Sequence, residues 1–328
     1  MRLLGVQFEI EGDDLNGNFP SHVEKFYERT NPGDVLIFPE DIGLLVAFSG
    51  VRANSTAESI EILYSADRER IDAIAKDPGI NNFISAIFLS LTDRFVRDFY
   101  NLFQSLSIKY GVYTVTCNNM PRFKRSGDRW EPANPRVYNT AFVFDTSGRL
   151  LFSQDKVFLT AEEMNLGISS GNLNEVSSFE IEGRQIGIAI SLDAFTPQYI
   201  SRLEDAEIII QPDANPGKWN SILSNGRWQP EEWMDSAYYI TQRMAKAKHV
   251  INPMMVGNLM DIRFEGQSSV TKKAEKGDIK MAYIGNQPTT GFHSIIGIEG
   301  FDPFDYVEKM RIIDRGLKFQ EGVIEIEI

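Results

Sequence analysis

RQIGIAISLDAF, residues 184–195, joins a buried strand to a polar stop. Residues 186–190 are apolar or glycine, a pattern typical of a strand covered on both faces. Ser191 and Asp193 then interrupt the run, and Thr196–Pro197 begin a predicted helix. A small hydroxyl side chain between a buried strand and a helix start occupies a position where nucleophiles are found in α/β enzymes. The stretch therefore predicts an α/β fold and makes Ser191 a candidate catalytic residue.

The N-terminal region repeats the same alternation of strands and helices. RLLGVQFEI (2–10) alternates like a strand, and SHVEKFYERTN (21–31) has apolar residues at helical spacing. VLIFPE (35–40) is a continuous apolar strand that ends on a charge. TDRFVRDFYNLFQSLSIKYG (92–111) predicts a long amphipathic helix. These segments indicate a sheet covered by helices, in one large domain without internal repeats.

The rest of the chain is assigned by the same rules. Residues 44–91 predict helical pieces, and residues 122–136 predict a polar loop. Further strands are expected at 112–119, 138–145, 150–159, 177–191 (a hairpin turning at Glu182–Gly183), 207–212 and 250–258, and further helices at 196–206 and 231–249.

Composition excludes several classes of protein. The net charge of −13 over 328 residues disfavours nucleic-acid and anionic-membrane partners. The single cysteine, Cys117, excludes an intramolecular disulfide or a cysteine-based metal site, and its place within a strand predicts a buried structural thiol. The three histidines stand alone, so we expect no metal. No apolar stretch approaches the roughly 18 residues of a membrane span, and we expect a cytoplasmic protein.

Three predicted strands end on side chains of complementary chemistry. Glu40 follows VLIFP, Lys156 interrupts LLFSQDKVFL, and Ser191 closes GIAIS. Strand ends of α/β sheets converge on ligand crevices, although a lone charge at a strand end is more often a solvated edge residue. A carboxylate in a partly apolar pocket can act as a general base, and an ammonium can stabilise an oxyanion. The backbone N–H of Leu192 is a second candidate oxyanion donor.

These motifs resemble those of the carbon–nitrogen hydrolase (nitrilase) superfamily, whose site is Glu–Lys–Cys with a second Glu. VLIFPEDIG (35–43) resembles the motif of the general base, Glu40. DKVFLTAEE (155–163) resembles the lysine motif, which implies Lys156 as oxyanion stabiliser and Glu163 as supporting acid, with Glu162 as the alternative. GIAISLDAFTPQ (187–198) resembles the nucleophile motif.

The resemblance spans about residues 2–300 and implies a four-layer α-β-β-α sandwich. We therefore predict a hydrolase domain over 1–300 with a helical insert at about 44–91. Residues 301–328 are predicted to form a C-terminal tail, serving as an arm in a dimer. The family implies a homo-oligomer, at least a dimer.

The resemblance also implies hydrolysis of a small-molecule amide, N-carbamoyl compound or nitrile through an acyl-enzyme, with no cofactor. The predicted pocket is edged by Asp41, Ile42, Asn215, Trp219 and the polar loop at 122–136. Trp219 either stacks on a flat substrate or packs in the interior.

Position 191 departs from the family, because serine stands where cysteine is usual. A serine hydroxyl is far harder to ionise than a thiol, so turnover should be impaired. Three hypotheses follow. The chain carries a Cys-to-Ser replacement in an otherwise ordinary hydrolase, or it is a silent binding module for a small molecule or a protein, or it is a serine amidase with an activated Ser191.

Overall fold

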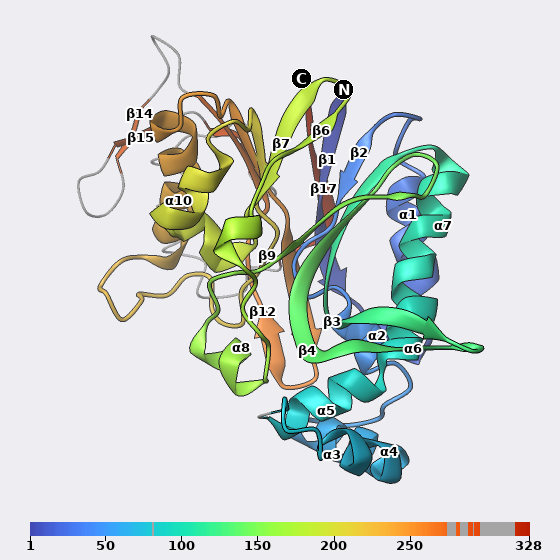
Figure 1. The fold of residues 1–328 in the computed structure, drawn as a ribbon. Helices are drawn as coiled ribbons and strands as arrows, with labels where there is room; N and C mark the ends of the chain where they lie inside the picture. The colour runs from blue at the N-terminus through green and yellow to red at the C-terminus, as the bar shows by residue number, and fades with distance from the viewer. Residues whose placement is uncertain (81, 274–279, 283–287, 291, 296–318) are drawn as a thin grey trace.

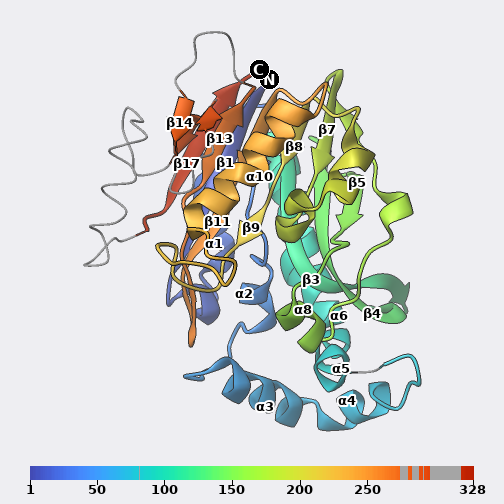
Figure 2. The ribbon, with the colours of Figure 1, turned by 90° about the vertical axis from the view of Figure 1, so that its left-hand side faces the viewer.

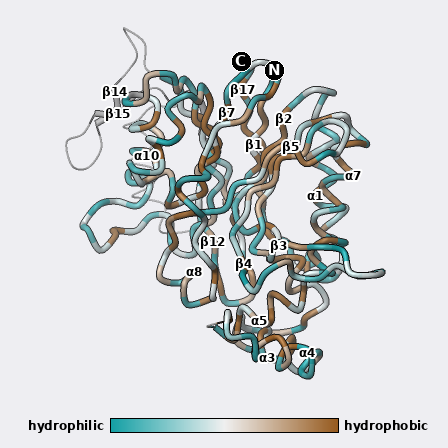
Figure 3. The backbone as a smooth tube through the Cα atoms, in the orientation of Figure 1, coloured by the Kyte–Doolittle hydropathy of each residue, from teal (hydrophilic) through white to brown (hydrophobic). Residues whose placement is uncertain are grey.

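Two β-sheets lie face to face in the computed structural model, which describes residues 1–80, 82–273, 280–282, 288–290, 292–295 and 319–328. Helices α1 and α7 cover the outer face of one sheet and α10 covers the other (Figure 1). Figure 3 shows hydrophobic residues along the central strands, between more hydrophilic outer segments. This is a four-layer α-β-β-α arrangement, so the predicted fold class is confirmed.

The larger sheet has nine strands, in the order β12-β11-β1-β2-β3-β4-β5, with β17 paired to β1 and β9 paired to β11. Strands β1, β2 and β3 run parallel, and β4 and β5 follow as antiparallel neighbours. In chain order the strands are β1 (Arg2–Ile10), β2 (Val35–Ile37), β3 (Tyr113–Ser126), β4 (Arg129–Phe144), β5 (Leu150–Asp155), β9 (Asp213–Ala214), β11 (Met254–Leu259), β12 (Ile262–Phe264) and β17 (Gly322–Glu327).

The smaller sheet has the order β16-β13-β10-β8-β7-β6, in which β7, β8 and β10 run parallel. Its strands are β6 (Phe179–Ile181), β7 (Arg184–Ile188), β8 (Ile208–Ile210), β10 (His249–Asn252), β13 (Ser269–Lys272) and β16 (Phe292–Ile295). Strands β14 (Lys280–Ala282) and β15 (Pro288–Thr290) form a separate pair.

The helices fall into those that cover the sheets and those that form the insert. They are α1 (Phe19–Tyr27), α2 (Leu44–Ala47), α3 (Thr56–Ala66), α4 (Arg68–Ile74), α5 (Phe83–Ser90), α6 (Thr92–Arg94), α7 (Asn101–Tyr110), α8 (Ala161–Asn165), α9 (Pro197–Ile200) and α10 (Gln229–Arg243). The helix predicted at 92–111 is therefore interrupted, because residues 95–100 between α6 and α7 form a π-helical segment.

Three apolar layers hold the four structural layers together. Phe38 on the larger sheet packs edge-on against Phe103 of α7, with ring centroids 5.1 Å apart. The neighbouring Ile37 points the other way, into a layer shared by both sheets. Ile240 of α10 belongs to the third layer, between the smaller sheet and its helices. Alternate residues of one strand thus serve different layers, which explains why VLIFPE is apolar throughout.

The loop predicted at 122–136 was wrong. Strands β3 and β4 continue through this region as a hairpin, pairing from Phe123 with Pro132 to Ser126 with Arg129. The rings of Phe123 and Trp130 meet edge-on at 5.5 Å, so alternate apolar residues pack while the charged residues between them face solvent. The charged residues outnumber the apolar ones, which hid the strand alternation in the sequence.

The insert at 44–91 forms α2 to α5, as the helical prediction expected. Figures 1 and 2 place α3 and α4 at one end of the molecule, with α5 between them and α8. Asn82 Nδ2 donates to the carbonyl of Asn165 at 2.7 Å, and Ser85 Oγ donates to that of Gly167 at 2.9 Å. The insert therefore supports the loop that carries α8.

The end of the predicted tail lies in the sheet of its own chain. Strand β17 pairs antiparallel with β1, and its Ile324 and Ile326 are buried between the two sheets. Residues 301–318 lie outside the described residues, and the limits 1–300 and 301–328 stay predictions. Within the described part of the chain, none of the helices combines the length and the apolar character needed to cross a membrane.

Candidate active site

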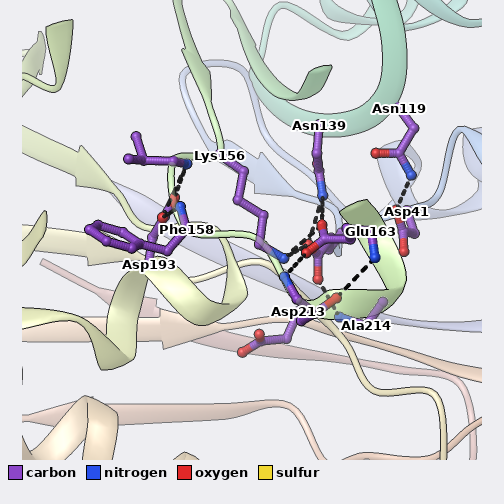
Figure 4. A network of polar contacts seen from close by, with 12 residues as sticks. Asp41, Asn119, Asn139, Lys156, Phe158, Glu163, Asp193, Asp213 and Ala214 are labelled. Atoms are coloured by element: carbon purple, nitrogen blue, oxygen red, sulfur yellow. Dashed lines mark hydrogen bonds and ion pairs between the residues drawn. The ribbon is translucent and has the colours of Figure 1, made fainter. Parts of the chain in front are cut away.

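Glu40, Lys156 and Glu163 form a buried ionic cluster. Lys156 Nζ donates to Glu40 Oε1 at 2.7 Å and to Glu163 Oε1 at 2.9 Å. Asn139 Nδ2 also donates to Glu40 Oε1, at 2.7 Å. Figure 4 shows Asn139, Lys156 and Glu163 converging on this cluster. The side chains of Lys156 and Glu40 are only 2% and 3% exposed, so water screens their attraction little. The structure thus joins two residues that lie 116 positions apart in the sequence.

The sheet topology explains why these residues meet. Glu40 follows the carboxyl end of β2, and Lys156 directly follows that of β5. Strands β2 and β5 point the same way in one sheet, so the residues after them lie at one edge. We predicted Lys156 within a strand, which is wrong. Strand β5 ends at Asp155, so Lys156 lies one residue beyond it.

Glu163 is oriented by the start of α8. Thr160 caps this helix, and Glu163 Oε2 accepts the Thr160 N–H at 2.9 Å in a capping box. The other carboxylate oxygen of Glu163 is then directed to Lys156. Glu162 is exposed on the same turn. Between the two acids that the sequence left open, Glu163 is therefore the one in contact with Lys156.

Ser191 lies at the sharp turn that follows β7. It begins a 3-10 turn, Ser191–Phe195, and has a left-handed backbone with φ of 47°. Such a conformation costs a non-glycine residue about 1–3 kcal/mol and is concentrated at functional sites. The Ser191 N–H donates to the carbonyl of Pro212 at 3.0 Å, which fixes the turn against the segment after β8.

Asp193 connects the Ser191 turn to the lysine loop. Its carboxylate accepts the Phe158 N–H at 2.8 Å and the Val157 N–H at 3.2 Å. Burial raises the pKa of Asp193 to about 8, although these two donors oppose the shift. The turn that begins at Ser191 is thus hydrogen-bonded to the two residues that follow Lys156.

Asp213, which sequence reasoning missed, lies near both Ser191 and the ionic cluster, because the Ser191 side chain and the charges of Glu40 and Lys156 all act on its carboxyl group. Its Oδ2 accepts from Asn252 Nδ2 at 2.6 Å and from Gln211 Nε2 at 3.0 Å. The next residue, Ala214, donates its N–H to Glu40 Oε2 at 3.1 Å. The signal was present in IIIQPD (208–213), another apolar strand that ends on an acid.

The site is rich in buried acid. Burial raises the pKa of Glu40 and, to a greater extent, that of Asp41. Burial and the nearby Glu40 carboxylate raise the pKa of Asp213 to about 7. Burial disfavours the Lys156 ammonium, but the carboxylates of Glu40 and Glu163 outweigh it and raise its pKa. Lys156 therefore stays charged, and Asp213, whose pKa is about 7, is partly protonated at neutral pH.

The predicted binding residues lie beyond this cluster. Asn215 Nδ2 donates to the carbonyl of Glu265 at 2.9 Å, and the Trp219 N–H donates to its carboxylate at 2.8 Å. Trp219 is 2% exposed and packs edge-on against Trp233. Of the two alternatives for Trp219, this environment matches packing in the interior. Leu192 follows Ser191 within the 3-10 turn.

Two further predicted residues have clear places. Cys117 is buried in the layer between the sheets, where burial raises the pKa of its thiol well above the usual value. Asp41 accepts a hydrogen bond from Asn119 Nδ2 at 2.7 Å, and its left-handed backbone redirects the chain after Glu40.

Comparisons with known proteins identify the fold. No family model and no curated protein matches the chain. Among solved structures, it is similar to an amidase from Nesterenkonia sp. (17% identity, 89% of each chain covered, TM-score 0.52). It is also similar to a carbon-nitrogen hydrolase from Helicobacter pylori G27 (15% identity, 95% of this chain and 92% of that chain covered, TM-score 0.56).

A cysteine-to-serine mutant of the Nesterenkonia AN1 amidase from the nitrilase superfamily matches as well, with 17% identity, 95% of each chain covered and a TM-score of 0.53. At such identities the likeness concerns the backbone arrangement. The chain therefore has the fold of solved nitrilase-superfamily amidases.

Proposed function

We propose that the protein hydrolyses the carbon–nitrogen bond of a small neutral amide through a covalent acyl-enzyme. Ser191 is the nucleophile, Glu40 the general base and Lys156 the oxyanion stabiliser. The observation that carries this proposal is the buried Lys156 between Glu40 and Glu163, on a loop that Asp193 joins to the turn of the strained Ser191. Buried ion pairs add little net stability, so a cluster of this kind is better explained by chemistry than by folding.

The arrangement suits the two half-reactions of acyl transfer. In the first, Ser191 Oγ adds to the amide carbonyl as its proton passes to a carboxylate of the site, and the Lys156 ammonium and the Leu192 N–H stabilise the oxyanion. The tetrahedral intermediate then expels the amine and leaves an acyl ester on Ser191. In the second, Glu40 activates a water that hydrolyses the ester. Glu163 and Asn139 hold Lys156 and Glu40 in place throughout.

The charge of the site favours a neutral substrate. Acids surround the Lys156 ammonium, since Glu40, Glu163 and Asp213 all lie near it. An anionic substrate would be repelled unless several of these acids were protonated. A complex of the Nesterenkonia amidase with butyramide is among the similar structures, which makes short aliphatic amides the first compounds to try. N-Carbamoyl compounds and nitriles are the other candidate classes.

The test compares the chain with Ser191→Cys on acetamide, propionamide and butyramide. Ammonia release measures turnover, and intact-mass spectrometry detects the acyl adduct. We expect Ser191→Cys to be at least about tenfold faster, because a thiolate forms more readily than an alkoxide. Glu40→Gln, in either background, and Ser191→Ala should abolish steady-state ammonia release.

The three hypotheses about Ser191 give different outcomes. A large gain in Ser191→Cys favours a replaced cysteine. Clear turnover of the chain itself, lost in Ser191→Ala, favours a serine amidase. Neither turnover nor an acyl adduct in any variant would refute the hydrolase proposal and favour a silent binding module.

A homo-oligomer and a cytoplasmic location are part of the same proposal. Both rest on the family resemblance and the sequence. Light scattering coupled to size-exclusion chromatography tests the first, and cell fractionation tests the second.

A further inference from the structure

The hydrogen bonds that Glu40 already accepts leave it poorly placed to act as the base in both acylation and deacylation. Its Oε1 accepts from both Lys156 and Asn139, each at 2.7 Å. Its Oε2 accepts the Ala214 N–H at 3.1 Å. A carboxylate oxygen offers about two lone-pair positions, so only Oε2 keeps one for a further proton.

Asp213 has the opposite pattern. Its Oδ2 accepts two amide donors, Asn252 and Gln211, which fix the plane of the carboxylate. Its Oδ1 is buried and, among the described residues, has no hydrogen-bond partner within 3.5 Å. A buried carboxylate oxygen without such a partner among these residues requires an explanation.

The neighbour that faces Asp213 is the candidate nucleophile. The Ser191 N–H is bonded to Pro212, the residue before Asp213, and the Ser191 side chain lies near enough to lower the pKa of the Asp213 carboxyl. The other charges that act on Asp213 are the Glu40 carboxylate and the Lys156 ammonium.

We propose that Asp213, rather than Glu40, accepts the proton of Ser191, and that Glu40 serves the hydrolytic water. This inference rests on the proposed amide hydrolysis and divides the base's role between two carboxylates. In acylation, the Ser191 Oγ–H bond breaks, its proton moves to Asp213 Oδ1, and Oγ bonds to the amide carbon. When the C–N bond breaks, Asp213 returns the proton to the leaving amine.

Deacylation balances in the same way. Glu40 takes a proton from water as the hydroxyl adds to the ester carbon. The C–Oγ bond then breaks, and the proton passes to Ser191 Oγ. A serine needs such help more than a cysteine does, because its hydroxyl is far more weakly acidic than a thiol.

The protonation balance of Asp213 fits this role. Burial and Glu40 disfavour its charge, whereas Asn252, Ser191 and Lys156 favour it, and the resulting pKa is about 7. A base is most effective when its pKa lies near the working pH, where it is both ionised and basic.

The test measures acylation directly with p-nitroacetanilide, using enzyme in excess and following p-nitroaniline release. Asp213→Asn should slow this step by about 100-fold or more, the usual contribution of a general base. The asparagine keeps the shape and still accepts from Asn252 and Gln211. In the Ser191→Cys background the same change should cost about tenfold or less, because the thiol needs a base less. The distant Asp145→Asn is the matched control and should leave the rate unchanged.

A second variant covers the case in which Asp213→Asn does not fold. Asn252→Ala removes a donor that favours the ionised acid, so the acid limb of the acylation rate should move to higher pH. A purely structural role would lower the rate without moving that limb.

Each outcome decides the proposal. Equal release by the unaltered chain and Asp213→Asn, or an unmoved limb in Asn252→Ala, overturns the assignment of Asp213 and leaves amide hydrolysis intact. No release and no acyl adduct in any variant, Ser191→Cys included, overturns both proposals together.

Discussion

Replacing Asp213 by asparagine should stabilise the folded protein at alkaline pH. Asp213 is fully buried, and burial together with the Glu40 carboxylate raises its pKa from 3.8 to about 7. Between these two values the folded state binds a proton that the unfolded state has released. Stability from this group is therefore complete below pH 3.8 and is lost as the pH rises through about 7.

The size of the effect follows from the shift. Each pKa unit corresponds to about 1.4 kcal/mol, so the full difference is roughly 4 kcal/mol. About 3 kcal/mol of this difference in unfolding free energy develops between roughly pH 5 and pH 8. Asparagine at this position carries no charge to desolvate, and its side-chain oxygen can still accept the two amide donors.

Urea unfolding of the protein and of Asp213→Asn across this pH range measures the difference. The advantage of the variant should grow by about 3 kcal/mol from the acidic to the alkaline end. Asp145→Asn is the control. Burial is outweighed there by hydrogen bonds from Ser147 and Arg149 that lower the pKa of Asp145, so the variant's difference from the parent should stay constant over this range. A pH-independent difference for Asp213→Asn would mean that Asp213 titrates normally, and the charge argument would be wrong.

Three other changes probe the site and its supports. Lys156→Met should lower the unfolding free energy in urea by about 3–5 kcal/mol, because it leaves buried carboxylates unpaired. Lys109→Met breaks an exposed ion pair and should change the urea midpoint little. Equal losses in the two variants would contradict the argument. Burial opposes the charge of His22, but two carboxylates outweigh it and raise its pKa to about 9. The stabilisation from the charged His22 is therefore present below pH 6.5 and is lost as the pH rises through about 9. The melting temperatures of His22→Gln and the parent should converge at high pH, and a difference that stays constant would exclude the charged histidine. Gly43→Ala should lower the unfolding free energy in urea by about 1–3 kcal/mol, because the added Cβ would lie 2.0 Å from the buried Asn118 side chain. Gly12→Ala meets nothing within 4 Å and should leave this free energy unchanged.

Much of the fold was predictable because the relevant signals are local. Strand β1 was predicted at 2–10 and lies there, and the hairpin turn at Glu182–Gly183 has positive φ at both residues. The extension of β3 and β4 into a hairpin over 122–136 was missed because its sequence is mostly polar. Pairing between the two strands stabilises it instead of an apolar pattern. The boundaries of α6 and α7 were missed because a π segment leaves the apolar spacing of the helix nearly intact.

The candidate site was predictable only in part, for a related reason. Polar residues at the ends of apolar strands marked Glu40, Lys156 and Ser191 from the sequence. Asp213 ends a strand in the same way, but no motif singled it out. Its importance comes from its surroundings. Ser191 and the Asp213 oxygen, for which the described residues offer no hydrogen-bond partner, come together only after β7 and β8 are paired.

The sequence by itself determined which segments become strands and helices and which reactive side chains follow them, because period and polarity act over a few neighbouring residues. Only the tertiary structure decided that Glu163, and not Glu162, contacts Lys156, and that Asp213 faces Ser191. Those choices depend on which way a capped helix turns and on which strands lie side by side. Both are fixed by burial of the whole core, which no local pattern contains.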